Sequence, residues 1–272
     1  MSELFDLRGR TAAITGGGGV LCGGVAEHLA RCGMAVAILD LKLEAAEAVA
    51  NAIRKNGGKA VAVACNVLER ASVESACEAC RKAMDRIDVL INGAGGNHPQ
   101  ATTGPDRRFF DLPIEAFGKV MDLNIIGTVL PSMVFGKAMA DRGEGVILNI
   151  ASMNAFRPLT KIAAYSAAKA AVKNFTEWLA VHMAQEYSPN IRVNGVAPGF
   201  FLTNQNRFLL TDEKTGELTP RGRSIIAHTP AGRFGAVEDL YGAIEWLVSP
   251  ASKFVTGVTV PIDGGFNAFS GV

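Results

Sequence analysis

Short runs of aliphatic residues alternate along this chain with longer segments in which apolar residues recur three and four positions apart. Several of the short runs are apolar on both faces, which is typical of strands covered by helices above and below. The longer segments have the spacing of amphipathic helices. The runs predicted as strands are 11–15, 35–39, 59–64, 89–92, 145–150, 191–196 and 257–262, and examples of predicted helices are 43–55, 71–84 and 163–187. This alternation predicts an α/β fold with a doubly wound, mostly parallel seven-stranded sheet and helices on both faces.

One region, 200–228, breaks the alternation, because it is charged and contains glycine and proline. Long loops inside compact domains are usually functional, so we expect region 200–228 to cover a substrate. No linker rich in proline or serine divides the chain, and no repeat recurs along it. Residues 1–272 are therefore expected to form a single domain.

Composition narrows the classes of partner. Of the 272 residues, 49% are hydrophobic and 19% are charged, which suits a well-filled globular core. The net charge of +1 provides no field to attract nucleic acid, so nucleic acid is not an expected partner. Residues 1–8 do not begin a secretory signal, and polar residues interrupt the apolar stretch 123–140. We expect no membrane span and a cytoplasmic location.

Metal and disulfide chemistry are not expected from the cysteines and histidines. The five cysteines lack the density of a disulfide scaffold, so free thiols are expected. Cys77 and Cys80 have the spacing of a redox or zinc pair, but they lie in a helical pattern without a second pair nearby. The four histidines show no metal-ligand spacing, and no metal is predicted.

A glycine-rich turn follows the first predicted strand, where Thr15 precedes four glycines, 16–19, and a helical pattern. Glycines let amides at a helix start approach a pyrophosphate, although four glycines could also form a simple flexible turn. About twenty residues later, Asp40 can accept hydrogen bonds from an adenosine ribose, or it could be a solvated turn residue. Together these features predict a Rossmann dinucleotide site. The carboxylate of Asp40 would repel the 2′-phosphate of NADP, so NAD is the preferred cofactor. Lys42 is close to Asp40 in the sequence and leaves NADP as an alternative.

Candidate catalytic residues lie in the middle of the chain, where Ser152 follows a predicted strand and Tyr165 and Lys169 are four residues apart. Residues four apart on a helix share a face, so the phenol and the ammonium can converge. The ammonium is expected to lower the pKa of Tyr165 and make the phenol usable in acid-base catalysis. Ser152 would hydrogen-bond the substrate oxygen. Alternatively, Tyr165 and Lys169 could be surface residues of an ordinary helix.

In combination, these features resemble the short-chain dehydrogenase/reductase family from the first strand to the C-terminus. The matching residues are Thr15, Gly16, Asn92, Gly93, Ala94, Gly95, Asn124, Ser152, Tyr165, Lys169, Pro198 and Gly199. The resemblance implies an NAD(P)-dependent enzyme acting on CH–OH groups, with Ser152, Tyr165 and Lys169 as catalytic residues. It further implies that Asn124 holds a water that relays protons to Lys169. It also implies dimers or tetramers, with the helix bearing Tyr165 at an interface. The residues expected at the cofactor are Gly16, Gly19, Val20, Leu21, Asp40, Asn66, Val67, Asn92, Ala94, Gly95, Tyr165, Lys169, Pro198, Gly199 and Thr203.

Three positions depart from the family pattern. Val20 and Cys22 stand where the glycine loop of the family usually has glycines. Asn66 stands where an aspartate usually follows the third strand. An amide can still hydrogen-bond adenine, so this contact is expected to survive.

A finer resemblance lies in the loops 95–100, 152–157 and 198–207, which are similar to the sugar-acid branch of the family, that of D-mannonate oxidoreductase or fructuronate reductase. A polyol chain needs amide and imidazole partners, and a carboxylate favours an arginine fork. The residues expected to bind substrate are His98, Asn154, Arg157 and Arg207, with similar groups on Gln100, Asn204 and Gln205. Solvent could instead satisfy any one of them.

The predicted function is hydride transfer between NAD(H) and the secondary alcohol or ketone of a sugar acid. A 3-oxoacyl reductase or another polyol dehydrogenase are alternatives with the same chemistry. An alternative of another class is a non-catalytic NAD-binding regulatory protein, since a fold alone does not prove chemistry.

Overall fold

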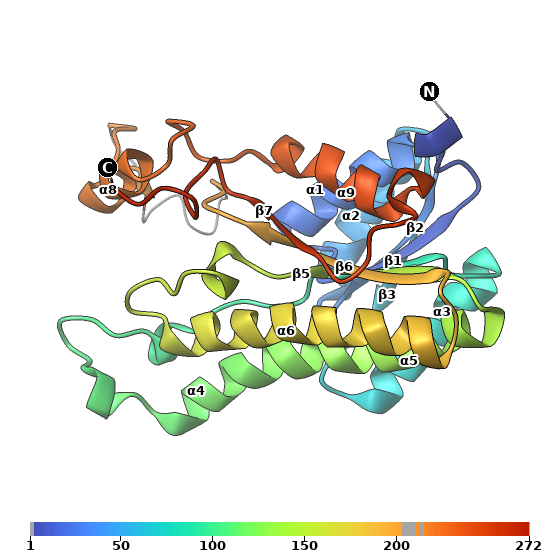
Figure 1. The fold of residues 1–272 in the computed structure, drawn as a ribbon, viewed down its shortest axis with the longest axis horizontal. Coiled ribbons are helices and arrows are strands. Elements are labelled where there is room, and N and C mark those ends of the chain that lie inside the picture. The colour runs from blue at the N-terminus through green and yellow to red at the C-terminus, as the bar shows by residue number, and fades with distance from the viewer. Residues whose placement is uncertain (1–2, 203–209, 213–214, 272) are drawn as a thin grey trace.

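Seven strands form one sheet in the order β3-β2-β1-β4-β5-β6-β7, and each neighbouring pair is parallel. The computed structural model in Figure 1 describes residues 3–202, 210–212 and 215–271. The strands are β1 (Thr11–Thr15), β2 (Ala35–Asp40), β3 (Lys59–Ala64), β4 (Val89–Asn92), β5 (Gly145–Ile150), β6 (Ile191–Pro198) and β7 (Thr259–Ile262). The predicted doubly wound fold with a seven-stranded sheet is confirmed.

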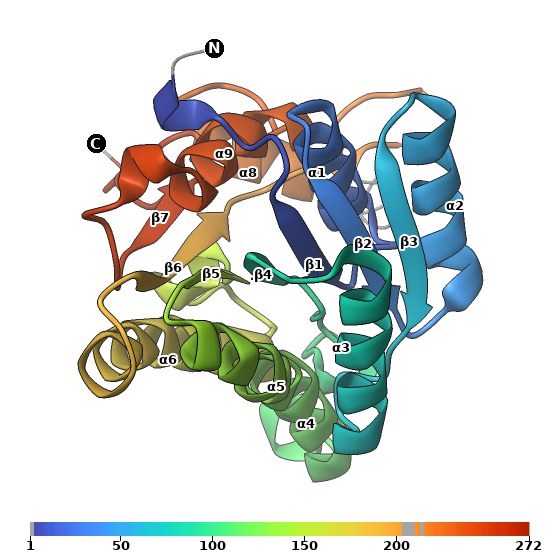
Figure 2. The ribbon, with the colours of Figure 1, turned by 90° about the vertical axis from the view of Figure 1, so that its right-hand side faces the viewer.

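Helices cover both faces of this sheet. Figure 2 shows α1, α2 and α9 along one face and α3, α5 and α6 along the other. The helices are α1 (Val20–Arg31), α2 (Leu43–Lys55), α3 (Arg70–Met84), α4 (Ile114–Met121), α5 (Gly127–Arg142), α6 (Ala163–Glu186), α8 (Pro220–Ala227) and α9 (Tyr241–Val248).

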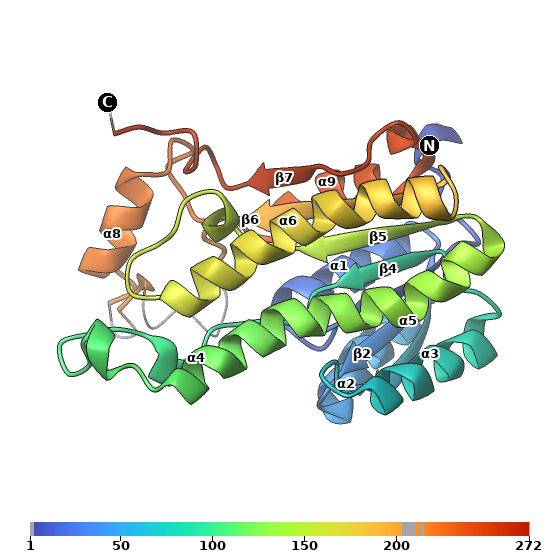
Figure 3. The ribbon, with the colours of Figure 1, turned by 60° about the horizontal axis from the view of Figure 1, so that its bottom comes forward.

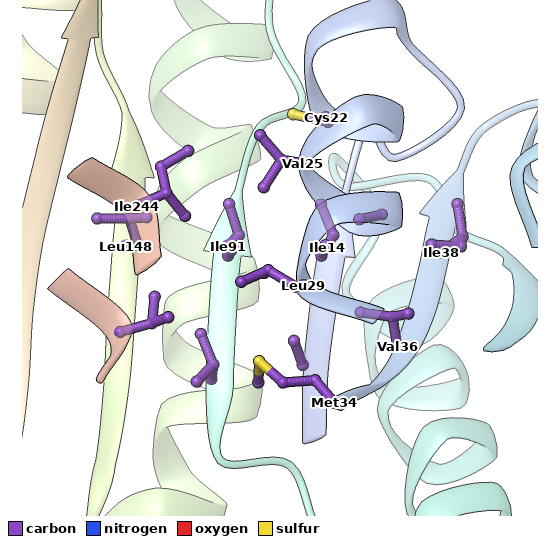
Figure 4. Packing of buried hydrophobic residues seen from close by; sticks show 14 of the residues in the cluster. Ile14, Cys22, Val25, Leu29, Met34, Val36, Ile38, Ile91, Leu148 and Ile244 are labelled. Atoms are coloured by element: carbon purple, nitrogen blue, oxygen red, sulfur yellow. The ribbon is translucent and has the colours of Figure 1, made fainter. Parts of the chain in front are cut away.

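Successive residues of the central strands face opposite layers of the core. Ile91 and Leu148 belong to one buried cluster, whereas their neighbours Leu90 and Ile147 belong to another. Figure 4 shows the first of these layers, in which side chains of α1 lie over those of β1, β2 and β4. Burial on both faces explains why the strand segments are apolar without alternation.

A long apolar helical run, 114–142, comprises α4, a π-helical turn labelled η4 (Asp122–Ile126) and α5. Within the described ranges, it is the one run long and apolar enough to cross a membrane. Half of its most apolar window is buried, and α5 contacts α3, β4 and β5. Figure 3 shows α6 lying alongside it. The run is therefore a core helix of the fold.

The carboxyl ends of the strands lie together at one edge of the sheet. In Figure 3 the arrowheads of β4, β5, β6 and β7 point towards the end of the molecule where α8 lies. The strand order runs outward in opposite directions from β1 and β4. Ligands of open α/β sheets bind beyond the carboxyl ends at such a switch in strand order.

The predicted elements agree with the structure to within two residues at their ends. β2 and β6 extend to Asp40 and Pro198, and β7 begins at Thr259. Region 200–228 contains α8, which the residue pattern did not indicate. Residues 203–209 and 213–214 of that region lie outside the described part of the chain.

Candidate functional site

A cavity of about 590 Å³ lies at the carboxyl ends of the strands, beside the turn between β1 and α1. A larger hollow of about 1150 Å³ lies at the opposite edge, where β1, β2 and β3 begin. The smaller cavity is the candidate site, because ligands of parallel sheets bind at the carboxyl edge. The predicted cofactor residues that line it are Gly16, Gly19, Val20, Leu21, Asp40, Asn66, Val67, Ala94, Gly95, Tyr165 and Gly199.

The glycine turn fits closely between its neighbours. Gly16 has φ +63°, and a Cβ there would lie 2.9 Å from the backbone of Ala94. A Cβ on Gly18 would lie 2.7 Å from Cβ of Ala45 and 3.0 Å from Oδ2 of Asp40. Only glycine therefore suits these two positions without a local shift, and the backbone at the start of α1 stays open to a ligand. Such a turn fits the pyrophosphate of a dinucleotide.

Asp40 joins the end of β2 to this turn. Its Oδ2 accepts a hydrogen bond from the Gly18 amide at 3.1 Å, and its Oδ1 accepts one from the Lys42 amide at 3.0 Å. A carboxylate has about four acceptor positions, so capacity remains for ribose hydroxyls. The geometry thus fits the predicted ribose contact.

Cys22, which departs from the family pattern, is accommodated by a second glycine. Its side chain is buried, and a Cβ on Gly93 would collide with its Sγ. Burial raises the pKa of the Cys22 thiol to about 11, so the thiol is neutral at pH 7. The pairing of Cys22 with Gly93 lets a larger side chain occupy this position without displacing the end of β4.

The end of β4 is held by buried hydrogen bonds. Thr15 Oγ1 accepts hydrogen bonds from the amides of Gly93 and Ala94 at 3.1 and 3.2 Å. Asn92 is buried, and its Nδ2 donates to Ser132 Oγ and to Asn149 Oδ1 at 2.9 and 2.8 Å. Asn92 thus supports the sheet beneath the cavity and does not line it.

Other residues predicted to bind the cofactor differ in whether they line the cavity. Asn66 lines the cavity, but its Nδ2 donates to Glu69 Oε1 at 2.8 Å and its Oδ1 accepts from the Leu68 amide at 3.1 Å. Lys169 and Pro198 are not among the lining residues, and Thr203 lies outside the described residues. Sequence reasoning missed further lining residues, most of which lie within four residues after a strand end: Cys22, Leu41, Cys65, Leu68, Gly96, Leu123, Phe200 and Phe201.

The candidate catalytic residues converge at one end of the cavity. Ser152 follows β5, and Tyr165 and Lys169 lie one turn apart near the start of α6. Interaction with the Ser152 hydroxyl lowers the pKa of the Tyr165 phenol. Lys169 is only 4% exposed, and its Nζ donates to the Ile150 carbonyl at 2.8 Å and lies 5.6 Å from the centre of the Tyr165 ring.

Asn124 joins this group from η4. Its Nδ2 donates to the carbonyls of Gly96 and Val120 at 2.7 and 2.8 Å, and its Oδ1 accepts from the Gly96 amide at 3.1 Å. A Cβ on Gly95 would lie 2.7 Å from Asn124 Oδ1 and 3.2 Å from Lys169 Nζ. The Gly95 backbone therefore lies against both side chains, and all four predicted catalytic residues are brought together.

Burial changes the pKa values of Tyr165 and Lys169. It lowers the pKa of Lys169 to about 8. It also raises the pKa of Tyr165, and only the hydrogen bond with Ser152 opposes it. The expected lowering of the Tyr165 pKa by Lys169 is not seen: burial raises this pKa, Lys169 is not among the groups that lower it, and its ammonium donates to the Ile150 carbonyl.

The described residues that were predicted to bind substrate do not gather around the cavity. His98 Nδ1 accepts a hydrogen bond from the Gln100 amide at 3.2 Å, and Arg157 donates to the Phe269 carbonyl at 3.4 Å. Neither lines the cavity. Asn154 is buried beside Ser152. Asn204, Gln205 and Arg207 lie outside the described residues.

One group of potential metal ligands occurs among the described residues. Single donor atoms of His28, Cys32 and Glu245 lie within 4.8 Å of one another, at the end of α1 away from the glycine turn. His28 Nε2 lies 3.1 Å from Glu245 Oε2, and the His28 ring stacks on Tyr241. These contacts join α1 to α9, and none of these residues lines the candidate site.

Comparison with known proteins identifies the family. A family model described as short chain dehydrogenase matches residues 10–214. The chain belongs to the short-chain dehydrogenase family. Like other members, this short-chain dehydrogenase is an NAD(P)-dependent oxidoreductase.

Relatives of this short-chain dehydrogenase cover nearly its whole length. It is 49% identical over 276 residues to UxuB, an uncharacterized oxidoreductase of Bacillus subtilis, with 98% of each chain covered. It is 46% identical to a protein of Haemophilus influenzae, provisionally named D-mannonate oxidoreductase, whose crystal structure holds NAD; the TM-score is 0.92, and 98% of each chain is covered. A gluconate 5-dehydrogenase from Burkholderia cenocepacia, in complex with NADP and tartrate, is 33% identical with a TM-score of 0.84 and 98% coverage of each chain.

Proposed function

We propose that this short-chain dehydrogenase interconverts the ketone and the secondary alcohol of a sugar acid, with D-fructuronate and D-mannonate as the first pair to test. The observation that carries the proposal is the 46% identity, over 98% of both chains, to the NAD-bound Haemophilus protein provisionally named for D-mannonate. At this coverage the catalytic loops are included in the match. The group of Ser152, Tyr165 and Lys169 supports the chemistry.

In the reductive direction, bound NADH supplies a hydride to the carbonyl carbon. Tyr165 gives its phenolic proton to the carbonyl oxygen, and Ser152 donates a hydrogen bond to the same oxygen as negative charge develops there. Lys169 supplies a positive charge near the phenol, and Asn124 holds the water through which Lys169 exchanges protons. In the oxidative direction each proton moves the opposite way.

Several groups would hold the cofactor. The amides around Gly16 to Gly19 would face the pyrophosphate, and Asp40 would accept hydrogen bonds from the adenosine ribose. A negative carboxylate at this position disfavours the 2′-phosphate of NADP, so NAD is the proposed cofactor. Lys42, whose backbone amide donates to Asp40, is a nearby cation that would favour NADP.

A gluconate-type keto acid is the second candidate substrate, favoured by the similarity to the gluconate 5-dehydrogenase. Both candidates are carboxylated polyols, for which His98, Arg157 and Arg207 offer suitable partners. A 3-oxoacyl thioester would need an apolar groove, and a regulatory NAD-binding protein would not need the complete catalytic group. Region 200–228 is proposed to cover the substrate.

The proposed enzyme acts in the cytoplasm as a dimer or tetramer. Exposed apolar side chains on α5 and α6 support association. We call Met133, Trp178 and Val181, which are 55%, 56% and 56% exposed, the α5–α6 face. Aromatic residues and methionine are enriched at protein interfaces.

A panel of ketones tests the proposal through the loss of NADH absorbance. Fructuronate, 5-keto-gluconate and an acetoacetyl thioester are compared, each with NADH and with NADPH. We expect the highest kcat/KM with fructuronate and NADH. Turnover of the thioester alone would refute the sugar-acid proposal, and no turnover of any ketone would favour the regulatory alternative.

A further inference from the structure

Both acceptor positions of the Asn154 side chain are filled by contacts within the protein. It is 5% exposed. Its Oδ1 accepts hydrogen bonds from the Leu159 amide at 3.1 Å and from Ser166 Oγ at 2.8 Å. Its Nδ2 donates to Ser152 Oγ at 3.2 Å. A substrate donor could reach Oδ1 only by breaking one of these bonds, and Nδ2 already donates to Ser152.

The orientation of the Asn154 amide is fixed by its partners. The Leu159 amide can only donate, so the atom that faces it must be the oxygen. The nitrogen therefore faces Ser152. Because Ser166 directly follows Tyr165 on α6, the same amide also couples the Ser152 loop to the helix that carries the phenol.

The hydroxyl of Ser152 receives two hydrogen bonds from one residue. The backbone amide of Asn154 donates to Ser152 Oγ at 3.3 Å, and the side-chain Nδ2 donates to it at 3.2 Å. A serine hydroxyl has two acceptor positions and one donor. With both acceptor positions filled, its own hydrogen is left to donate to another group, and Ser152 lowers the pKa of the Tyr165 phenol.

We infer that Asn154 is a positioning residue that locks Ser152 as a hydrogen-bond donor to the substrate oxygen. This inference rests on the proposed hydride-transfer function. In ketone reduction the proton still comes from Tyr165 and the hydride from NADH. Ser152 loses no proton, and its fixed donor stabilises the negative charge that develops on the substrate oxygen.

Replacing Asn154 with aspartate separates this role from simple packing. Aspartate keeps the shape and the acceptor for Leu159 and Ser166, but it presents a second acceptor to Ser152. The Ser152 hydrogen would then turn to the carboxylate, and the new negative charge would raise the pKa of Tyr165. We expect Asn154→Asp to lose about a hundredfold or more in kcat, with the pH profile of alcohol oxidation moved to higher pH.

Asn154→Ala provides the comparison. It removes the side-chain donor without adding an acceptor, so Ser152 keeps the backbone donor, and we expect about a tenfold loss in kcat. The NADH dissociation constant should stay within about twofold in both variants. A packing role predicts the reverse order, because alanine leaves a gap and aspartate does not. Asn190→Asp, at an exposed turn, is the matched charge control and should keep wild-type activity.

The outcomes distinguish this inference from the function on which it rests. An Asn154→Asp enzyme as active as Asn154→Ala, or one with an unmoved pH profile, would overturn the positioning role. If the aspartate variant does not fold, an unchanged kcat in Asn154→Ala would overturn it equally. The Tyr165→Phe enzyme is assayed in parallel: if it is active, the proposed function itself is wrong, whatever Asn154 does.

Discussion

The ammonium of Lys169 lies in buried surroundings that destabilise its positive charge. Its side chain is almost fully buried, and burial lowers its pKa from 10.5 to about 8. One hydrogen bond, to the Ile150 carbonyl, offsets part of this cost. An ammonium kept in such a place for catalysis is expected to reduce the stability of the fold.

Replacing this amine with an apolar side chain should stabilise the protein while abolishing turnover. We expect Lys169→Met to raise the free energy of unfolding by about 1 to 2 kcal/mol at pH 7. Below pH about 8 the amine is protonated in both the folded and unfolded chain, so the full cost applies. Between about 8 and 10.5 the folded chain releases this proton first, and the wild type gains stability as the pH rises.

Urea unfolding of both proteins at several pH values measures this difference. The advantage of Lys169→Met should shrink as the pH rises from 8 towards 10.5. A variant that is less stable than the wild type at pH 7, or a difference independent of pH, would show that the buried charge is not the source of the cost.

The relative positions of Tyr165 and Lys169 could be predicted because helical geometry alone places them on one face. The partners of Asn154 could not, because the amide of Leu159 and the hydroxyl of Ser166 compete with substrate for the same atoms. That competition is decided by the path of the chain after β5, which no local pattern specifies. The direction of the Tyr165 pKa shift was missed for the same reason, since burial depends on the whole fold.

A buried arginine on the sheet hydrogen-bonds the C-terminal end of helix α9. Arg192, on β6, donates to the carbonyls of Leu247 and Ser249 at 2.9 and 3.1 Å and to Ser252 Oγ at 2.9 Å. These carbonyls belong to the last turn of α9 and its continuation, where backbone acceptors lack helical partners. Burial lowers the pKa of Arg192 to about 10, yet the guanidinium stays charged at pH 7.

Removal of this guanidinium should destabilise the protein, because the Leu247 and Ser249 carbonyls would lose a charged donor and keep only their contacts with Ser252. We expect Arg192→Met to lower the free energy of unfolding by about 2 to 3 kcal/mol. Arg70→Met, at an exposed position on α3, should change it by less than about 0.5 kcal/mol. Thermal and urea unfolding compare the two, and similar small effects from both would contradict a capping role for Arg192.

The elements themselves were largely predictable. Strands buried on both faces are continuously apolar, so the seven runs identified from the sequence agree with the structure to within two residues at their ends. Helix α8 was not predicted, because a short helix of mixed polarity in region 200–228 lacks a clear apolar stripe. The larger hollow, where β1, β2 and β3 begin, was also not predicted, because no pattern of residues in the sequence indicates it.

The single-chain structure leaves apolar side chains of α5 and α6 in contact with water. Trp178 stacks between Phe175 and His182, so the exposed aromatic surface is preorganised along one helix. Rigid aromatic residues at the centre of an interface contribute much of its binding energy. Pairing of two copies through the α5–α6 face would bury this surface on both sides.

Charges placed on the α5–α6 face should therefore weaken assembly. We expect the double variant Trp178→Glu/Val181→Glu to raise the dissociation constant of the oligomer by at least about a hundredfold, because paired copies would bring like charges together. Lys82→Glu, on the exposed side of α3, serves as a charge control. Sedimentation velocity over a range of concentrations measures both, and an unchanged assembly in the double variant would place the interface elsewhere.

Turnover by Tyr165→Phe tests the catalytic account most directly. The variant keeps the ring and loses only the hydroxyl that we assign as proton donor. The account predicts that NADH binding, followed by fluorescence, stays within about twofold of wild type while kcat for ketone reduction falls by about a thousandfold. Turnover at the wild-type rate would contradict it.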